Sequence, residues 1–235
     1  MPPIDFPMTP TTWIDDAVEH KRCRELRDHF LGTYREPLLA LIRLHAPGLS
    51  HDAEEIVHSF LIRTFGSSPD AAVRFAARAR LSGFRLRRYI ANGLLFHTRG
   101  IMRDRHRGAT RTAPLPPDAF DTQMALTPAA DEAFERAWAQ SVVRDACTRV
   151  ESLLQGSGRG RSDVAWDVFR RHTIDGRRYS DLTAEFGLEE QQMADLVRRV
   201  VRLLRREITN TLELEGIPAP EVEAELERLL ARLWD

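Results

Sequence analysis

The sequence is poor in cysteine, and its two cysteines, Cys23 and Cys147, lie far apart along the chain. A disulfide framework and a Cys-x-x-Cys zinc site are therefore both excluded. No apolar run approaches the roughly 20 residues that a membrane helix needs. The first ten residues lack the basic start and apolar block of a secretory signal. These absences predict a protein of the reducing cytoplasm with no membrane partner.

Signatures of the large enzyme classes are also missing, because the chain contains no P-loop, GxSxG or HExxH motif. His51, Glu55 and His58 lie one and two turns apart on one expected helix, but a di-iron bundle needs a second Glu-x-x-His motif and none exists. His51-Asp52 resembles the His-Asp pair of metal phosphohydrolases, yet no further ligands can be assigned. We therefore predict no enzyme activity, no metal site and no cofactor.

Lysine is almost absent, and the basic residues are arginines gathered in two blocks. Residues 74–111 hold eleven arginines against one acid, Asp104, and residues 198–206 hold five arginines and no acid. The rest of the chain is acidic, so the formal net charge is only −1. A charge run is often just a solvated surface, but clusters as dense as these favour a nucleic acid as partner.

The apolar residues follow helical spacing almost throughout, which predicts an all-α fold for the 235 residues. Residues 108–130 contain four prolines and no helical period, which is typical of an exposed linker. We therefore expect two small helical modules, over residues 11–112 and 131–212, joined by a Pro-rich linker over 113–130. Residues 213–235 are expected to form an acidic C-terminal helix.

Residues 179–208 have the pattern of a helix–turn–helix. Ser180 can cap a short helix that carries Leu182 and Phe186, Gly187 suits a tight turn, and a long helix follows from about Glu189. The apolar residues of the long helix, from Met193 to Ile208, lie opposite its arginines. Such a helix can enter a major groove, although the acids in its first turn would repel phosphate. The alternative is an amphipathic helix with solvated arginines.

The order of these features resembles that of bacterial RNA polymerase sigma factors of the extracytoplasmic-function type. The segments that carry the resemblance are Tyr34-Arg35-Glu36-Pro37-Leu38, Asp52-Ala53-Glu54-Glu55-Ile56-Val57, Leu86-Arg87-Arg88-Tyr89-Ile90, Arg103-Asp104-Arg105 and Tyr179–Leu188. The sequence departs from the family pattern at His58-Ser59, at Phe96 and at Gln191-Gln192-Met193. These departures leave room for a specialised factor.

The resemblance implies a protein that directs core RNA polymerase to promoters, reads their minus-ten and minus-thirty-five elements and assists DNA melting. It implies that Asp52, Glu55 and His58 contact the polymerase. It also implies that aromatic side chains such as Phe84 stack on separated bases. The residues assigned to promoter DNA are Arg85, Arg87, Arg88, Tyr89, Phe96, Arg99, Arg103, Arg105, Arg107, Arg198, Arg199, Arg202, Arg205 and Arg206. An anti-sigma factor is a further partner that the resemblance allows.

Two other functions stay open at this point. The chain could be a stand-alone, dimeric helix–turn–helix regulator, or a protein-interaction adaptor whose arginines are merely solvated. The C-terminal helix carries Val222, Leu226 and Leu229 on one stripe and mostly acids elsewhere. It either completes the second module or acts as a latch whose acids cover Arg198–Arg206.

Overall fold

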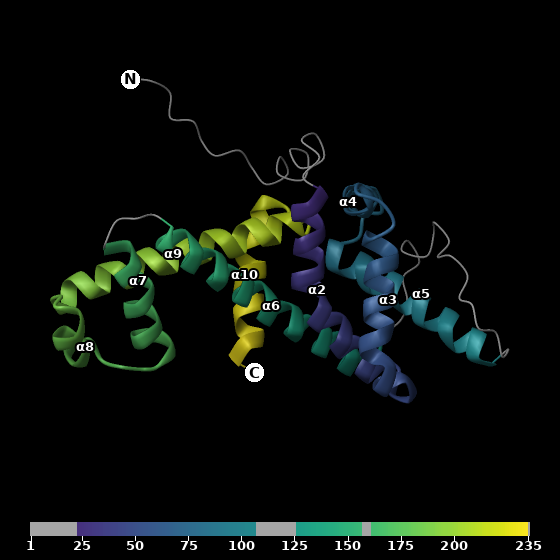
Figure 1. Cartoon of the computed structure of the whole chain (residues 1–235), viewed down its shortest axis with the longest axis horizontal. Coiled ribbons are helices and arrows are strands. Elements are labelled where there is room, and N and C mark those ends of the chain that lie inside the picture. The colour runs from purple at the N-terminus through teal and green to yellow at the C-terminus, as the bar shows by residue number, and fades with distance from the viewer. Residues whose placement is uncertain (1–22, 107–125, 157–160, 235) are drawn as a thin grey trace, which may run out of the picture. The chain divides into compact units, whose positions relative to one another are not determined.

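The computed structural model describes residues 23–106, 126–156 and 161–234, which form nine α-helices and no β-strand. The prediction of an all-α fold is therefore confirmed for this part of the chain. The helices are α2 (Cys23–His45), α3 (Ala53–Phe65), α4 (Ala71–Leu81), α5 (Leu86–His106), α6 (Pro128–Gln155), α7 (Arg161–Phe169), α8 (Tyr179–Phe186), α9 (Glu190–Leu214) and α10 (Val222–Trp234) (Figure 1). Short 3-10 helices, η1 (Pro47–Asp52) and η4 (Ala219–Glu221), precede α3 and α10, and a π-helical turn, η3 (Arg170–Ile174), ends α7.

The chain divides into two compact units. Unit 1 contains the chain up to Ser141 together with Leu212–Asp235, and unit 2 contains Val142–Thr211. Helix α6 therefore begins in unit 1 and ends in unit 2, whereas α9 begins in unit 2 and ends in unit 1. This division differs from the expected modules, because residues 131–141 and the acidic C-terminal helix group with the first bundle. Most of the expected linker lies outside the described residues.

Unit 1 is built around a cluster of aromatic side chains from α2, α3, α4 and α5. Phe30 stacks on Phe65 with ring centres 4.8 Å apart, and Phe75 lies edge-on to both rings. Tyr89 joins the cluster through Phe75, at 5.1 Å. Aromatic pairs in these geometries add about 0.5–1.5 kcal/mol each to the effect of burial. They fix the first four described helices around one core.

Two local expectations in unit 1 are corrected by the structure. Pro37 was expected to start or kink a turn, but it lies inside α2, where it removes one backbone hydrogen bond without ending the helix. Ser50 was expected to cap the next helix, but η1 intervenes. Helix α3 instead begins at Ala53 after Asp52, with no side-chain cap.

Helices α3 and α5 run antiparallel. The Asp52 carboxylate accepts a hydrogen bond from Arg105 at 2.7 Å. Further along α3, the Ser59 hydroxyl lies 3.1 Å from Nε2 of His97. Residue numbers rise along α3 as they fall along α5, which fixes the antiparallel direction. Burial and the nearby Arg63 charge lower the pKa of His97 to about 4, so its ring is neutral at physiological pH.

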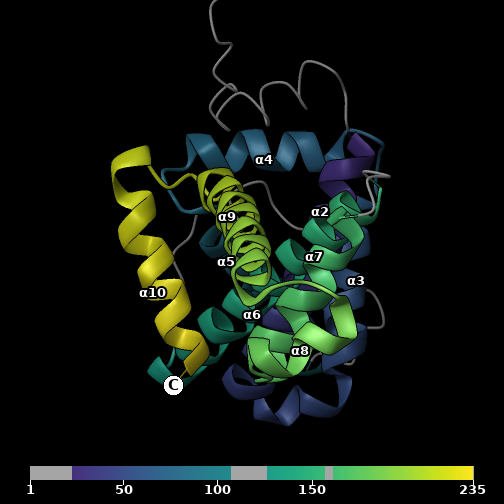
Figure 2. The ribbon, with the colours of Figure 1, turned by 90° about the vertical axis from the view of Figure 1, so that its left-hand side faces the viewer.

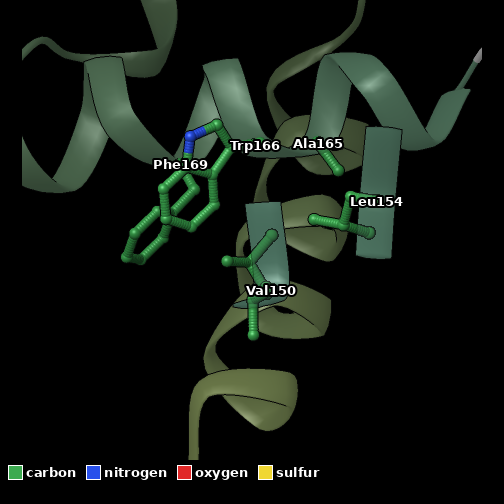
Figure 3. Packing of buried hydrophobic residues seen from close by; sticks show 6 residues of the cluster. Val150, Leu154, Ala165, Trp166 and Phe169 are labelled. Carbon is green, nitrogen blue, oxygen red and sulfur yellow. The ribbon is translucent and has the colours of Figure 1, made fainter. Parts of the chain in front are cut away.

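Unit 2 has its own core between α6, α7 and α9. Val150 and Leu154 of α6 meet Ala165, Trp166 and Phe169 of α7, as Figure 3 shows, and Val200 of α9 completes the cluster. A second cluster joins Val168, Leu182 and Met193, which brings α8 against α7 and the start of α9. This packing buries one side of the first half of α9 and leaves the other side free.

The connection between α8 and α9 is short. Helix α8 ends at Phe186, and Gly187 follows with a φ of +62°, a left-handed conformation that glycine adopts without strain. The Gly187 N–H donates to the Thr183 carbonyl at 2.9 Å, which closes the last turn of α8. The short helix, glycine turn and long helix expected from the sequence are thus all present as backbone elements.

Candidate nucleic-acid interface

The arginines of the first basic block that were assigned to DNA form two groups along α5. Arg85, Arg87 and Arg88 lie at its N-terminal end, whereas Arg99, Arg103 and Arg105 lie in its second half. Arg107 lies outside the described residues. The two groups have different surroundings, so the sequence block is not one continuous basic surface.

Arg87 is buried, with only 3% of its surface exposed. Its guanidinium group binds Glu135 of α6 at 2.9 Å and Glu225 of α10 at 2.6 Å, and it lies 4.2 Å from the centre of the Trp138 ring. Two carboxylates and an aromatic face are strong partners for one buried cation. In this conformation Arg87 is therefore a packing residue of unit 1, and the expectation that it faces DNA does not fit its burial.

The neighbouring arginines are held in the same way but are less buried. Arg85 binds Glu225 at 3.1 Å and lies 3.9 Å from Glu221, and Arg88 binds Asp131 at 3.1 Å. All three arginines of this group therefore face acids of α6, η4 or α10 within unit 1.

The aromatic candidates of this segment also differ in burial. Tyr89 is 1% exposed and packs on Phe75, so it belongs to the core and presents no ring to a base. Phe84 and Phe96 are half-buried. Core packing, the simpler interpretation of such aromatics, therefore applies to Tyr89.

The second half of α5 is accessible. Arg99, Arg103 and Arg105 are exposed, and Met102 between them is an exposed apolar side chain. Arg105 is paired with Asp52, whereas Arg103 forms no ion pair with another described residue. This end of α5 can therefore meet a phosphate group directly.

The residues expected to contact the polymerase lie on one side of α3 and its N-terminal end. Glu55 and His58 are exposed, and Asp52 is half-buried next to Arg105. Their spacing of three residues places them on the same side of the helix. The buried side of α3 carries Ile56 and Phe60 instead. The segment is therefore not hidden inside its own bundle.

The second basic block forms one surface on α9. Arg198, Arg199, Arg202, Arg205 and Arg206 are all exposed. They are spaced mainly three or four residues apart, so they lie on one side of the helix. Arg198 pairs with Asp195, and Arg206 lies 3.4 Å from Glu207. Arg199 and Arg202 form no ion pair within the described part of the chain. We call these five residues the α9 arginine face.

Contacts at the start of α9 explain two residues, Gln192 and Met193, at which the sequence departs from the family pattern. The Gln192 side-chain oxygen accepts a hydrogen bond from the Glu189 N–H at 3.1 Å, which is one half of a capping box at the helix start. Met193 is fully buried in the contact with Leu182. Gln192 and Met193 therefore serve the local fold, whereas Gln191 remains exposed.

Sequence reasoning missed the buried acids of unit 1. Glu225 has a side chain with no exposed surface, and Glu215 is 1% exposed. Burial alone would raise the pKa of Glu225, but Arg87, Arg85 and Arg228 outweigh it and lower that pKa. Glu225 lies three residues after Val222 and four before Leu229, on the apolar stripe of α10. An acid on an apolar stripe was the signal that could have found it.

The pKa of Glu215 is shifted in the opposite direction to that of Glu225. Burial raises its pKa to about 8, and the nearby Glu225 charge adds to the effect, while a hydrogen bond from the Arg87 N–H at 2.8 Å opposes it. The Tyr34 hydroxyl also donates to the Glu215 carboxyl group. At neutral pH Glu215 is therefore mostly protonated.

The acidic C-terminal segment has partners within unit 1. The acids of the C-terminal segment that pair with arginines of the basic blocks, Glu221 and Glu225, meet Arg85 and Arg87 of the first block. The expectation that this helix covers Arg198–Arg206 stays a prediction.

Among the described residues, no group of three or more His, Cys, Asp or Glu side chains is arranged to hold a metal ion, and no helix is long and apolar enough to cross a membrane. No protein-family model, curated protein or solved structure matches this chain.

Proposed function

We propose that this chain is a transcription initiation factor of the sigma type, which binds promoter DNA and core RNA polymerase and assists strand opening. The observation that carries the proposal is the α9 arginine face. One side of the helix is buried against α7 and α8, and the opposite side presents five exposed arginines.

The energetics of this face favour a polyanionic partner. Like charges three or four residues apart on a helix destabilise it by about 0.2–0.5 kcal/mol per pair. Asp195 and Glu207 offset part of this repulsion through ion pairs with Arg198 and Arg206. A row of phosphates would neutralise all five arginines and release condensed counterions.

The dimensions of the face fit duplex DNA. From Arg198 to Arg206 the helix rises by about 12 Å, which is close to the width of the major groove, roughly 12 Å. Helix α8 and the turn at Gly187 would then form the first part of a helix–turn–helix. Gln191, on the same side as Asp195 and Arg198, can reach a base edge, because a glutamine amide pairs with adenine.

Unit 1 would supply the other contacts. Glu55 and His58 on the exposed side of α3 would bind core polymerase, and Arg99 and Arg103 on α5 would hold the strand at the minus-ten element. The polymerase carries out the chemistry, so the factor itself needs no catalytic residue. Phe96, half-buried beside this end of α5, is the aromatic candidate for an unstacked base.

Replacing Arg199 and Arg202 with alanine tests the proposal. Because both side chains would neutralise phosphates, the double variant should bind duplex DNA at least tenfold more weakly, and the slope of log K against log salt should fall by about 1.8. The measurement is fluorescence anisotropy with duplex DNA over a salt series. The control is the double variant Arg24→Ala and Arg170→Ala, which removes two exposed arginines from α2 and η3.

Equal loss in the test and control variants would show that DNA binding does not use α9. Duplex binding that depends on α9, without any capture of core RNA polymerase or stimulation of run-off transcription, would favour the stand-alone regulator. A salt-independent interaction, or none, would favour the protein-interaction adaptor.

A further inference from the structure

We propose that α10 is an autoinhibitory clasp, in which Glu225 occupies Arg85 and Arg87 in place of the phosphates of a DNA strand. The inference rests on the proposed function, since it adds Arg85 and Arg87 to the arginines of unit 1 that would bind DNA once α10 has moved away. It differs from the latch expected from the sequence, which placed the acidic helix on the α9 arginine face.

Three arginines bind the carboxylate of Glu225. It receives hydrogen bonds from Arg87 at 2.6 Å, from Arg85 at 3.1 Å and from Arg228 of its own helix. Arginine binds carboxylate and phosphate through the same planar fork, so the two anions compete for one site. The clasp therefore withholds two guanidinium groups from any outside anion.

The same C-terminal segment also covers the backbone donors at the start of α5. The Leu86 N–H donates to the Glu215 carbonyl at 3.3 Å, and the Arg87 N–H donates to the Glu215 carboxyl group at 2.8 Å. The first N–H groups of a helix are natural partners of an anion. Gly216, with a φ of +80°, lies in the turn that follows α9. Figure 2 shows α9 and α10 joined by this turn.

The clasp can open without dismantling the site beneath it. Arg87 keeps Glu135 and the Trp138 ring on α6 as partners when Glu225 leaves, so its side chain stays in place. The Nη1 atom of Arg87 is buried without a hydrogen-bond partner and is available to a further acceptor. Arg85 is partly exposed at the edge of the contact, where a phosphate can first enter.

The apolar stripe of α10 sets how firmly the clasp is closed. Val222, Leu226 and Leu229 are buried in unit 1, whereas Leu230 and the remaining acids face outward. Because a DNA strand and α10 would bind the same arginines, each must weaken the binding of the other by the same factor.

The test compares Glu225→Gln with its matched control, Glu227→Gln, in the full-length protein. Glu227 is an exposed glutamate on the same helix, so both variants lose one charge. The probe is a mixed-sequence single-stranded DNA oligonucleotide, followed by fluorescence anisotropy over a salt series. Glu225→Gln should bind about five- to tenfold more tightly than wild type. Its salt slope should be steeper by about 0.7 for each freed arginine.

The control variant should bind as wild type does. Equal binding by the two variants overturns the clasp. Circular dichroism establishes that both are folded before binding is compared.

Hydrogen exchange on the unaltered protein gives an independent measurement if Glu225→Gln does not fold. Saturating single-stranded DNA should accelerate amide exchange in residues 222–234, because the strand displaces α10. Unchanged protection of α10 in DNA-bound protein contradicts the clasp.

The two proposals fail in different ways. If Arg199→Ala with Arg202→Ala weakens duplex binding while Glu225→Gln matches its control, the clasp is wrong and the proposed function stands. If neither the wild type nor any variant binds DNA, the proposed function is wrong and the clasp falls with it.

Discussion

Glu215 and Glu225 lie in the same unit, yet burial affects their carboxyl groups in opposite ways. Glu225 is surrounded by arginines and stays ionised, because their charges outweigh its desolvation. Glu215 has a tyrosine hydroxyl and a backbone N–H as partners, and these neutral groups do not offset its burial. At neutral pH the Glu225 carboxyl group is therefore ionised, and the Glu215 carboxyl group is mostly protonated.

Glu215 makes the stability of unit 1 depend on pH. Its folded pKa of about 8 lies above its ordinary value of 4.5. The folded state therefore binds more protons between these values, and stability falls as pH rises from about 4.5 to about 8. The slope for one such group is at most about 1.4 kcal/mol per pH unit. Below pH 4.5 the contribution is fully present.

Glu215→Gln should remove this dependence. The glutamine amide oxygen can accept from the Arg87 N–H, and the amide NH2 can donate to the Tyr34 oxygen once that hydroxyl turns, but the amide cannot ionise. At pH 8 the variant should therefore be more stable than wild type, and its stability should change less between pH 5 and pH 8. Urea unfolding at several pH values measures the difference. If Glu215→Gln shows the same slope as the exposed control Glu227→Gln, Glu215 does not retain its proton in the folded state.

At the scale of the element, α9 is defined by two opposite sides and a fixed start. Met193 and Val200 are fully buried on one side, and the arginine face lies on the other. The turn at Gly187 sets the direction in which α8 leads into α9, and only a left-handed residue closes α8 in this way. The position of the arginine face relative to α8 therefore depends on one glycine.

Gly187→Ala should destabilise unit 2 by about 1–2 kcal/mol, because an alanine in the left-handed conformation brings its Cβ close to the backbone. A Cβ at Gly187 would meet no neighbouring atom within 4 Å, so the loss comes from backbone strain and not from a clash. Thermal unfolding followed by circular dichroism measures it. Gly48→Ala is the control, since that position is equally open and lacks a positive φ. An equal effect at both positions would rule out the strain.

At the scale of the whole molecule, the charged side chains are unevenly distributed along the chain. The formal charge of −1 conceals an acidic side of α3, the exposed arginines of α5 and the α9 arginine face. The first would suit a protein partner, and the others a nucleic acid. A factor that joins DNA to an enzyme needs both kinds of surface on one chain.

The double variant Glu55→Ala and His58→Ala should weaken binding to core RNA polymerase by roughly tenfold or more, because central interface side chains carry most of the binding energy. Run-off transcription should fall in parallel, while binding to duplex DNA should not change. Glu227→Ala controls for the loss of an exposed helical glutamate. Full transcription by the double variant would place the polymerase contact elsewhere.

Much of the secondary structure was predictable, because helical periodicity is a local property of the chain. The spacing from Met193 to Ile208 predicted both the long helix and its arginine face. Two local predictions, at Pro37 and at the start of α3, were wrong because the helices do not follow the usual proline and capping signals there. Pro37 lies within α2, and α3 begins after a 3-10 turn without a side-chain cap.

The candidate site was predicted in part. Arg103 and the α9 arginines are exposed as expected, but Arg87 and Tyr89 are buried. The local sequence does not show that Arg87 is buried and Arg103 exposed, because both are arginines of the same helix, α5. Their difference comes from Glu135 and Glu225, which lie 48 and 138 residues away in the sequence.

The sequence by itself determined the all-α fold, the two arginine blocks and the amphipathic character of α9, because these depend on composition and on spacings within one helix. Only the tertiary structure decided which arginines are free. Burial and ion pairing depend on distant residues that the fold brings together, as Glu225 of α10 and Arg87 of α5 show.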